Sequence, residues 1–382
     1  MSDPIPHNAN VLFQSFPFGR VTLPNRIVMA PMTRSKSPGN VPGADMAAYY
    51  RRRAEGGVGL IVTEGTHPGF KGAQGYPDVP DFHGAKALAG WQKVAAEVHQ
   101  AGGFIIPQIW HVGSIRKKGI GPNPDEAIVG PSSVMHPFHL MEGGEPPEGA
   151  EVPEAMTQAD IDVCVAAYGR AAGDALDNGF DGVEIHGAHS YLIDQFFWEA
   201  TNQRDDRYGG NLAQRTRFAV EIIQTMRARV PDDFPIVFRF SQWKSGDYHH
   251  KMAGSPEELE SFLLPLSEAG VDVFHCSTRR FNDPEFEGSH LNLAGWTKRL
   301  TGKPAITVGS IGLDNDFLRT FGGQEAHAAD ISALIGRMEN REFDLAAVGR
   351  ALLSDPAWAR KIQTGREAEI TEFTREYLQK LT

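Results

Sequence analysis

One repeated phrase constrains this chain more than any other feature: a helix-like stretch, a glycine, and a short apolar run that ends in polar residues. It occurs at 51–65, 97–111, 174–189 and 266–278. A glycine can take the left-handed conformation that ends a helix, and near-continuous apolar runs are typical of strands buried on both faces. Repeated units of this length predict parallel strands joined by crossover helices.

Eight strand candidates follow one another along the chain, with helix candidates between them. The strands are 27–32, 59–64, 103–110, 182–187, 235–240, 271–276, 305–309 and 345–349. Apolar residues at helical spacing mark helices at 158–178 and 256–269, and Ser255 is a favoured residue for starting the second. Eight such units predict a closed (β/α)₈ barrel, or TIM barrel, with an open doubly wound sheet as the alternative.

Two segments do not fit the repeat. Residues 11–24 predict a hairpin before the first strand, and the proline- and glycine-rich residues 112–156 form a long connection after the third strand. In a barrel this connection would overhang the end at which active sites are built. We interpret 112–156 as a capping loop, with a surface excursion as the alternative, and the whole chain, 1–382, as one domain.

Charge and cysteine content exclude several classes of protein. With 37 basic and 48 acidic residues the net charge is −11, so neither nucleic acid nor a membrane is expected as a partner. Cys164 and Cys276 form no CxxC pair, which argues against an iron–sulfur cluster. We find no secretory signal and no apolar run of about 20 residues, and therefore expect a cytoplasmic location.

Polar residues stand at the predicted strand C-termini, the end of a TIM barrel that carries the active site. In chain order they are Thr33, Glu64, Gln108, His186 with His189, Arg239, Ser277, Gly309, and Gly349 with Arg350. The set offers hydrogen-bond donors, a fixed cation and two imidazoles, but few free carboxylates. Such a set suits a polar, planar ligand with an anionic tail better than a metal ion.

The last two predicted strands end in glycines, in ITVGSIG and LAAVGRAL. Loops at this place frequently bind phosphate in TIM barrels, because bare backbone N–H groups can approach it. Arg350, directly after Gly349, can pair with a phosphate through two hydrogen bonds. The two glycines together favour a phosphate site, and tight turns without a ligand are the alternative.

His186, His189 and Tyr191 follow the fourth strand. A zinc site would need a third ligand, and no obvious one follows, so no metal is expected; a metal-dependent hydrolase built on the histidine pair is the alternative. Two neutral imidazoles can instead hydrogen-bond a substrate oxygen, and Tyr191 beside them becomes a candidate proton donor. Trp110, at the end of the third strand, either plugs the barrel or forms a wall of the pocket.

At these residues the sequence closely resembles the Old Yellow Enzyme family of FMN-dependent ene-reductases, nearly from end to end. The histidine–tyrosine segment followed by an RxDxYGG stretch is highly specific. The matching segments are LPNRIVMAPMTR (23–34), PQIWHVG (107–113), VGPSSV (129–134), VEIHGAHSYLIDQFF (183–197), TNQRDDRYGG with QRTRF (201–218), VFRFS (237–241) and VGRALLSDP (348–356).

The resemblance implies three groups of site residues. The flavin ring of FMN would contact Pro31, Met32, Thr33, Gly65, Gln108 and Arg239. Its phosphate would be held by Gly309, Ser310, Gly349 and Arg350. The substrate would be bound by His186 and His189, with Trp110 lining the pocket and Tyr191 giving the proton.

The implied activity is reduction of an electron-poor alkene, an α,β-unsaturated carbonyl compound or a nitroalkene, at the expense of NADH or NADPH. Hydride would come from flavin N5 and a proton from Tyr191. The chain departs from the family pattern at Ser190, at Phe197-Trp198-Glu199, and in 278–292 and 323–342. These departures surround the active face, so they bear on the range of substrates and not on the flavin site.

Overall fold

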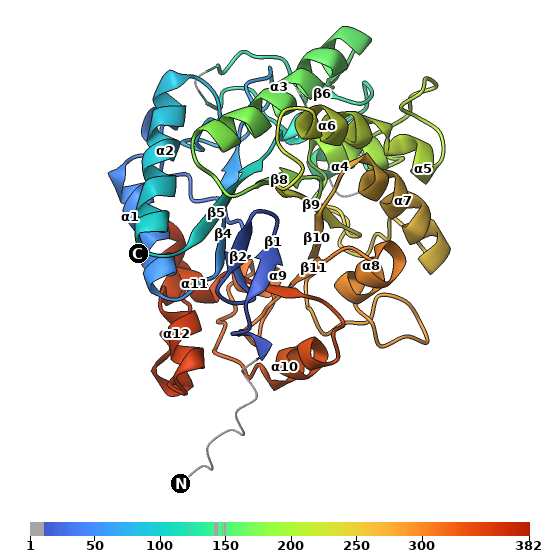
Figure 1. Cartoon of the computed structure of the whole chain (residues 1–382). Coiled ribbons are helices and arrows are strands. Elements are labelled where there is room, and N and C mark those ends of the chain that lie inside the picture. The colour runs from blue at the N-terminus through green and yellow to red at the C-terminus, as the bar shows by residue number, and fades with distance from the viewer. Residues whose placement is uncertain (1–10, 122, 141–143, 147, 149) are drawn as a thin grey trace.

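The computed structural model describes residues 11–121, 123–140, 144–146, 148 and 150–382, and its centre is a closed barrel of eight parallel strands (Figure 1). Strand order around the barrel follows chain order, and the last strand pairs with the first. The prediction of a TIM barrel is confirmed, and every predicted strand overlaps an observed one. The barrel strands are β3 (Ile27–Met29), β4 (Leu60–Thr66), β5 (Phe104–Ile109), β8 (Val183–His186), β9 (Ile236–Ser241), β10 (Val273–Ser277), β11 (Ala305–Val308) and β12 (Leu345–Val348).

Helices cover the outside of the barrel (Figure 1). The longer ones are α1 (Ala44–Glu55), α2 (Ala85–Gln100), α3 (Gln158–Asp177), α6 (Arg217–Arg227), α7 (Pro256–Ala269), α8 (Leu293–Thr301) and α10 (Ser332–Glu339). The shorter ones are α4 (Leu192–Phe197), α5 (Leu212–Arg215), α9 (Phe317–Phe321), α11 (Ala351–Ser354) and α12 (Trp358–Gln363). Both predicted helices are confirmed as α3 and α7, and the Ser255 side chain accepts the N–H of Glu258 at the start of α7.

The N-terminal hairpin closes one end of the barrel. It consists of β1 (Phe16–Phe18) and β2 (Val21–Leu23), which pair antiparallel as predicted. Figure 1 shows it in the middle of the view, in front of the barrel. Its apolar side chains pack with a layer of inward-facing residues near the strand N-termini: Val28, Leu60, Val62, Ile106, Val237, Val273, Ile306 and Leu345.

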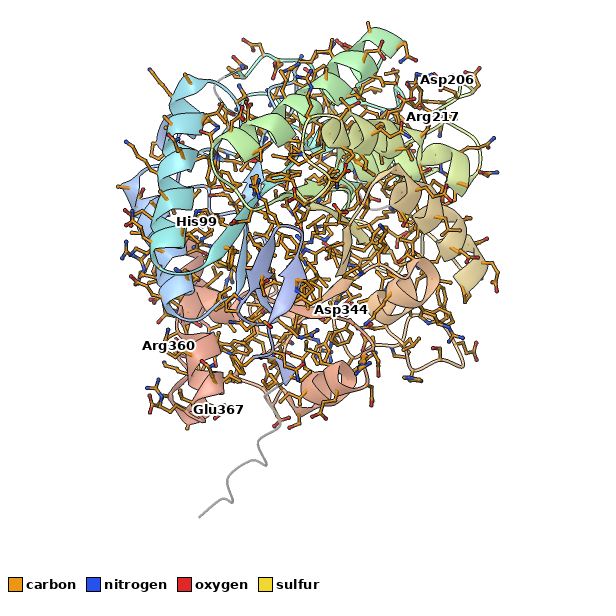
Figure 2. All side chains as sticks on the ribbon, in the orientation of Figure 1. His99, Asp206, Arg217, Asp344, Arg360 and Glu367 are labelled. Atoms are coloured by element: carbon orange, nitrogen blue, oxygen red, sulfur yellow. The ribbon has the colours of Figure 1, made fainter. Side chains whose placement is uncertain are left out.

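Short 3₁₀ turns and the chain end complete the fold. The turns are Pro38–Asn40, Gly113–Ile115, Pro137–His139, Glu367–Glu369 and Arg375–Gln379. The C-terminal segment, marked by Arg360 and Glu367 in Figure 2, packs back on α1, where the Arg360 N–H donates to the carbonyl of Gly56 at 2.9 Å. Among the described residues, no helix is both long and apolar enough to cross a membrane.

The segment 112–156 reaches the loop that follows β8. Its described part contains two 3₁₀ turns and the two-residue strands β6 (Val129–Gly130) and β7 (Glu154–Ala155). His136 is fully buried, and its Nε2 lies 3.1 Å from the carbonyl oxygen of Ser190. Residues 122, 141–143, 147 and 149 of the predicted capping loop lie outside the described residues.

Candidate active site

The barrel interior changes from apolar to polar toward the strand C-termini. Side chains of a strand alternate between its two faces, so residues two positions beyond the apolar layer also point inward. On β5, β9 and β10 those residues are Gln108, Arg239 and His275, all buried. Because polar groups removed from water need partners, this layer is held by hydrogen bonds.

Glu184 of β8 is the centre of that network. Its Oε1 accepts a hydrogen bond from Gln108 Nε2 at 2.7 Å, and its Oε2 lies 2.7 Å from Nδ1 of His275. Its negative charge also acts on Arg239. Glu184 and His275 were not predicted from the sequence, because they stand inside apolar runs. Each lies two residues before a predicted site residue on the same strand, and that spacing could have revealed them.

Arg239 is a buried cation with unused hydrogen-bonding capacity. It is 7% exposed, and its Nη2 lies 3.4 Å from Ser277 Oγ. Its Nε has no hydrogen-bond partner among the described residues. Burial lowers the pKa of Arg239 and Glu184 opposes that shift, and a guanidinium keeps its charge in proteins. The free N–H can therefore serve the polar edge of a ligand that carries negative charge.

Hydrogen bonds orient both histidine rings and assign the proton of His186. His186 Nδ1 accepts the N–H of Ala188 at 3.3 Å, which leaves the ring proton on Nε2. His189 Nε2 lies 2.8 Å from Ser277 Oγ. Ser277 Oγ also accepts from Arg239, and a hydroxyl oxygen with two lone pairs can then either donate to His189 Nε2 or accept from it. In either case each imidazole keeps one N–H donor, and the ring centroids are 5.1 Å apart.

The two imidazoles are neutral near neutral pH. Desolvation, aided by the positive charge of Arg239, holds the pKa of both His186 and His189 well below the usual 6.5. Within the described residues, no group of three or more His, Cys, Asp or Glu side chains is placed to hold a metal ion.

The backbone that carries His189 is left-handed and tightly held. His189 and Ser190 have φ angles of 61° and 63°, a region that glycine enters more readily than other residues. The N–H of Ser190 donates to Asp194 Oδ2 at 2.6 Å, and its carbonyl accepts from Gln195 Nε2 at 2.7 Å. Asp194 is in turn ion-paired with Lys244, and both side chains are fully buried. These bonds offset the strain that serine brings to this turn.

Tyr191 stands beside the histidine pair, against Trp110. Its ring centroid is 5.0 Å from that of His186 and 4.8 Å from that of Trp110, both edge to face. Trp110 fills the space over Gly65, where any Cβ would collide with the indole ring. Desolvation, with Tyr76 adding to it, raises the pKa of Tyr191 well above 10, so its hydroxyl carries a proton.

The predicted flavin and phosphate residues lie on neighbouring strand ends. Pro31, Met32 and Thr33 follow β3 and are partly or fully exposed. A Cβ at Gly349, after β12, would lie 3.6 Å from Met32 Sδ, so these two segments are side by side. Gly309, after β11, has φ 150°, and a Cβ there would lie 2.8 Å from Thr278 Oγ1. Ser310 follows with φ 54°.

Arg350 is partly committed to another segment. Its Nη1 donates to the carbonyl of Asp316 at 3.3 Å, and it also bonds the Thr320 hydroxyl and the Asn315 carbonyl. Burial lowers the pKa of Arg350 to about 10. The guanidinium therefore anchors the start of α9, a role that the sequence did not reveal.

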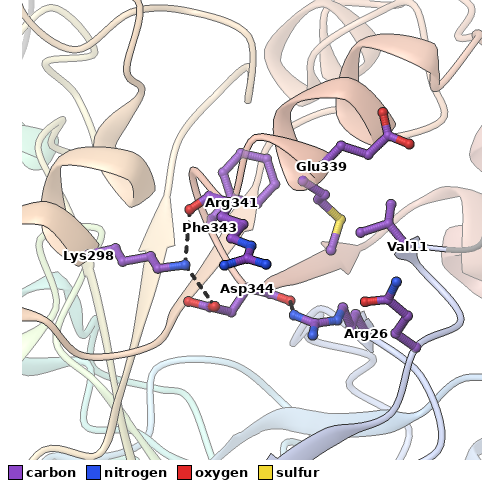
Figure 3. Close-up of a pocket in the computed structure, with 9 residues that line it drawn as sticks. Val11, Arg26, Lys298, Glu339, Arg341, Phe343 and Asp344 are labelled. Carbon is purple, nitrogen blue, oxygen red and sulfur yellow. Dashed lines mark hydrogen bonds and ion pairs between the residues drawn. The ribbon is translucent and has the colours of Figure 1, made fainter.

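A cavity of about 540 Å³ lies at the opposite end of the barrel. It is lined by Arg26 and Asp344, which directly precede β3 and β12 (Figure 3). Lys298 Nζ donates to Asp344 Oδ1 at 2.9 Å and to the carbonyl of Arg341 at 3.0 Å. These bonds tie α8 to the start of β12, and none of the predicted site residues lines this cavity.

Comparison with known proteins agrees with this geometry. Residues 11–369 match the model of the NADH:flavin oxidoreductase / NADH oxidase family. Putative 12-oxophytodienoate reductase 2 of Oryza sativa subsp. japonica is 31% identical over 92% of this chain and 86% of its own length. NADH oxidase of Thermoanaerobacter brockii is 34% identical over 94% of this chain but only 52% of its own length.

A solved structure gives the same result. Morphinone reductase in complex with tetrahydroNAD superposes with a TM-score of 0.77 at 26% identity, over 96% of this chain and 93% of that protein. The metal-dependent hydrolase is not favoured by any of these relatives. The chain belongs to the NADH:flavin oxidoreductase / NADH oxidase family, that is, the Old Yellow Enzyme family, and is an FMN-dependent oxidoreductase that uses a nicotinamide as reductant.

Proposed function

We propose that this enzyme reduces electron-poor C=C bonds, in α,β-unsaturated carbonyl compounds and nitroalkenes, with electrons from NADH or NADPH. One observation carries the proposal: two neutral imidazoles, those of His186 and His189, stand beside the protonated hydroxyl of Tyr191. In this proposal the Ser277 hydroxyl donates to His189 Nε2, and the donors are His186 Nε2 and His189 Nδ1. Relatives named for reducing oxophytodienoate and morphinone support it.

The residues at this end of the barrel fit FMN. The buried guanidinium of Arg239 keeps a free N–H, and Gly309 and Gly349 stand at the ends of the adjacent strands β11 and β12, with Gly349 beside Met32. The ring would be flanked by Pro31, Met32, Thr33, Gly65, Gln108 and Arg239, and the phosphate held by Gly309, Ser310, Gly349 and Arg350. A guanidinium has five N–H groups, so the bonds of Arg350 to 315–320 leave donors for phosphate. When bound, FMN would supply the hydride chemistry that links the nicotinamide to the substrate.

In this proposal the histidine pair binds the carbonyl or nitro oxygen of the substrate. Both N–H groups donate to it, and these bonds strengthen as negative charge develops on the oxygen. Tyr191 holds its proton until the neighbouring carbon becomes basic, and then transfers the proton to that carbon.

We also propose that segment 112–156 caps the site and limits the entry of water. His136 joins it to the turn that carries His189, through the carbonyl of Ser190. Phe138 packs against the loop after β9, where a Cβ at Gly246 would lie 3.2 Å from the Phe138 Cα. Excluding water strengthens the hydrogen bonds made inside the site.

Titration with phenols tests the proposed oxygen site. Phenols should bind as phenolates to the two N–H donors and give a long-wavelength absorption band with oxidised flavin. The double variant His186→Ala, His189→Ala should lose the band and keep its FMN. A control pair, His290→Ala with His327→Ala, removes two exposed histidines elsewhere and should leave the band unchanged. Unchanged phenol affinity in the first double variant would overturn the proposal.

A panel of enones, nitroalkenes and nitrate esters, assayed with NADH and NADPH, then tests the substrate class. Turnover of electron-poor alkenes is the expected result. Turnover confined to nitrate esters or oxygen would place the activity elsewhere within the family.

A further inference from the structure

We propose that Tyr76 is a second tyrosine of the proton path and transfers its own proton to Tyr191 as Tyr191 protonates the substrate. This inference rests on the proposed function, because it takes Tyr191 as the acid. It adds a residue that acts through Tyr191 and lies on a different loop, the connection between β4 and α2.

The two hydroxyl groups are in hydrogen-bond contact. The oxygen of Tyr76 lies 3.2 Å from the oxygen of Tyr191. In the part of the chain that the structure describes, no other side chain hydrogen-bonds the Tyr191 hydroxyl. Tyr76 is partly exposed, and the proposal takes its hydroxyl to exchange its proton with water.

Trp110 sets the spacing of the two tyrosines. The ring of Tyr76 stacks on it at a centroid distance of 5.5 Å with 25° between the planes, whereas Tyr191 meets it edge to face. One rigid indole thus aligns both hydroxyl groups.

The backbone on each side of Tyr76 is fixed. The carbonyl of Ala73 accepts from Val112 N at 3.1 Å, and the carbonyl of Asp78 accepts from Ser37 N at 2.9 Å. A Cβ at Gly75 would lie 2.8 Å from a Val112 methyl group, so the chain is closely packed there. Tyr76 is therefore held in a defined position and not carried on a free loop tip.

The proton balance of the proposed step is simple. When the substrate oxygen is bound to His186, the reacting carbons of the substrate lie beside Tyr191. The substrate then separates the Tyr191 hydroxyl from water in the site. Tyr191 O–H breaks as the new C–H bond forms, Tyr76 O–H breaks as the Tyr191 O–H forms again, and water restores the proton of Tyr76. Desolvation, with Tyr76 adding to it, keeps the pKa of Tyr191 well above 10, and Arg239 opposes that shift.

A double-mutant cycle on the alkene-reducing half-reaction tests this inference. In the FMN-loaded enzyme, Tyr76→Phe should slow enone reduction at least several-fold while leaving flavin reduction by the nicotinamide unchanged. In the Tyr191→Phe background the same substitution should have no further effect, because Tyr76 acts only through Tyr191. Tyr377→Phe, which removes the hydroxyl of another partly buried tyrosine in the C-terminal 3₁₀ turn, is the matched control and should leave the rate unchanged.

A solvent-isotope measurement gives a readout that a purely structural role would not change. The rate in H₂O–D₂O mixtures should fit one transferring proton fewer in Tyr76→Phe than in the wild type. Equal slowing by Tyr76→Phe in both backgrounds, or no slowing in the wild-type background, would overturn the inference. A normal rate in Tyr191→Phe alone would instead contradict the proposed function, so the two failures are distinguishable.

Discussion

The two ends of the barrel are built from the same strands but differ in chemistry. On β5, β9 and β10, the apolar residues Ile106, Val237 and Val273 face the hairpin, and two residues further on the interior becomes polar. Apolar packing is non-directional and stabilises whatever shape fills the space, whereas polar groups out of water need specific partners. Within the barrel interior, apolar packing is therefore concentrated at the end closed by the hairpin. Groups available to a ligand, such as the free Nε–H of Arg239, are concentrated at the opposite end.

Acid should destabilise the protein through the histidines buried at the polar end. This is the largest effect that we expect. Burial lowers the pKa of His67 to about 4 and of His111 and His136 to about 3, against the usual 6.5. Below pH 6.5 the unfolded chain therefore binds protons that the folded chain does not, and the free energy of unfolding falls as the pH falls. Each histidine contributes up to about 1.4 kcal/mol per pH unit. Urea unfolding at several pH values between 6.5 and 4 measures this slope.

Two variants sharpen the acid prediction. Burial raises the pKa of Glu64 to about 7 from 4.5, so this carboxyl binds its proton first in the folded state and offsets part of the loss between these values. Glu64→Gln should steepen the slope. His67→Phe should flatten the slope, because it removes one of the titrating imidazoles. Phe should be accepted there, since neither ring nitrogen of His67 has a hydrogen-bond partner among the described residues. Constant stability on acidification would show that the buried histidines do not govern it.

Truncating the apolar end should reduce stability without changing the chemistry. Phe18 is the last residue of β1 in the hairpin, is 1% exposed and packs against the barrel. Phe18→Ala should lower the free energy of unfolding by about 3–5 kcal/mol, the usual cost of removing a buried aromatic ring. Activity per folded molecule should stay the same. Leu264→Ala, at a site that is 37% exposed, is the control and should have little effect. A specific loss of FMN from folded Phe18→Ala would mean that the two ends are coupled.

Removing one hydrogen bond at the polar end should have a smaller effect on binding. Ser277→Ala frees Nε2 of His189 and allows the ring proton to move between its two nitrogens. Phenol affinity should fall roughly 2- to 10-fold, since one neutral hydrogen bond contributes about 0.5–1.5 kcal/mol. Ser277→Thr keeps the hydroxyl and should restore the affinity. Equal affinity in Ser277→Ala would show that Ser277 does not set the tautomer.

The repeated strand–helix pattern in the sequence made the barrel predictable. The same pattern placed Gln108, Arg239 and Gly349 at the ends of strands. Glu184 and His275 were missed because apolar neighbours on the same strand hid their inward direction. Contacts between loops had no periodic signal at all. The bond from Tyr76 to Tyr191, the link from His136 to Ser190, and the anchoring of α9 by Arg350 depend on how separate loops fold over one another.

The central claim is that the site at the strand C-termini reduces alkenes, with Tyr191 as the acid. Stopped-flow measurement of the two half-reactions in Tyr191→Phe tests this claim most directly. The substitution keeps the ring and its packing on Trp110 and removes only the hydroxyl. Flavin reduction by the nicotinamide should stay within a few-fold of the wild type, because it needs no proton from this residue. Enone reduction should slow by roughly 10²–10⁴, the usual contribution of a positioned acid. Enone reduction at the wild-type rate would contradict the account.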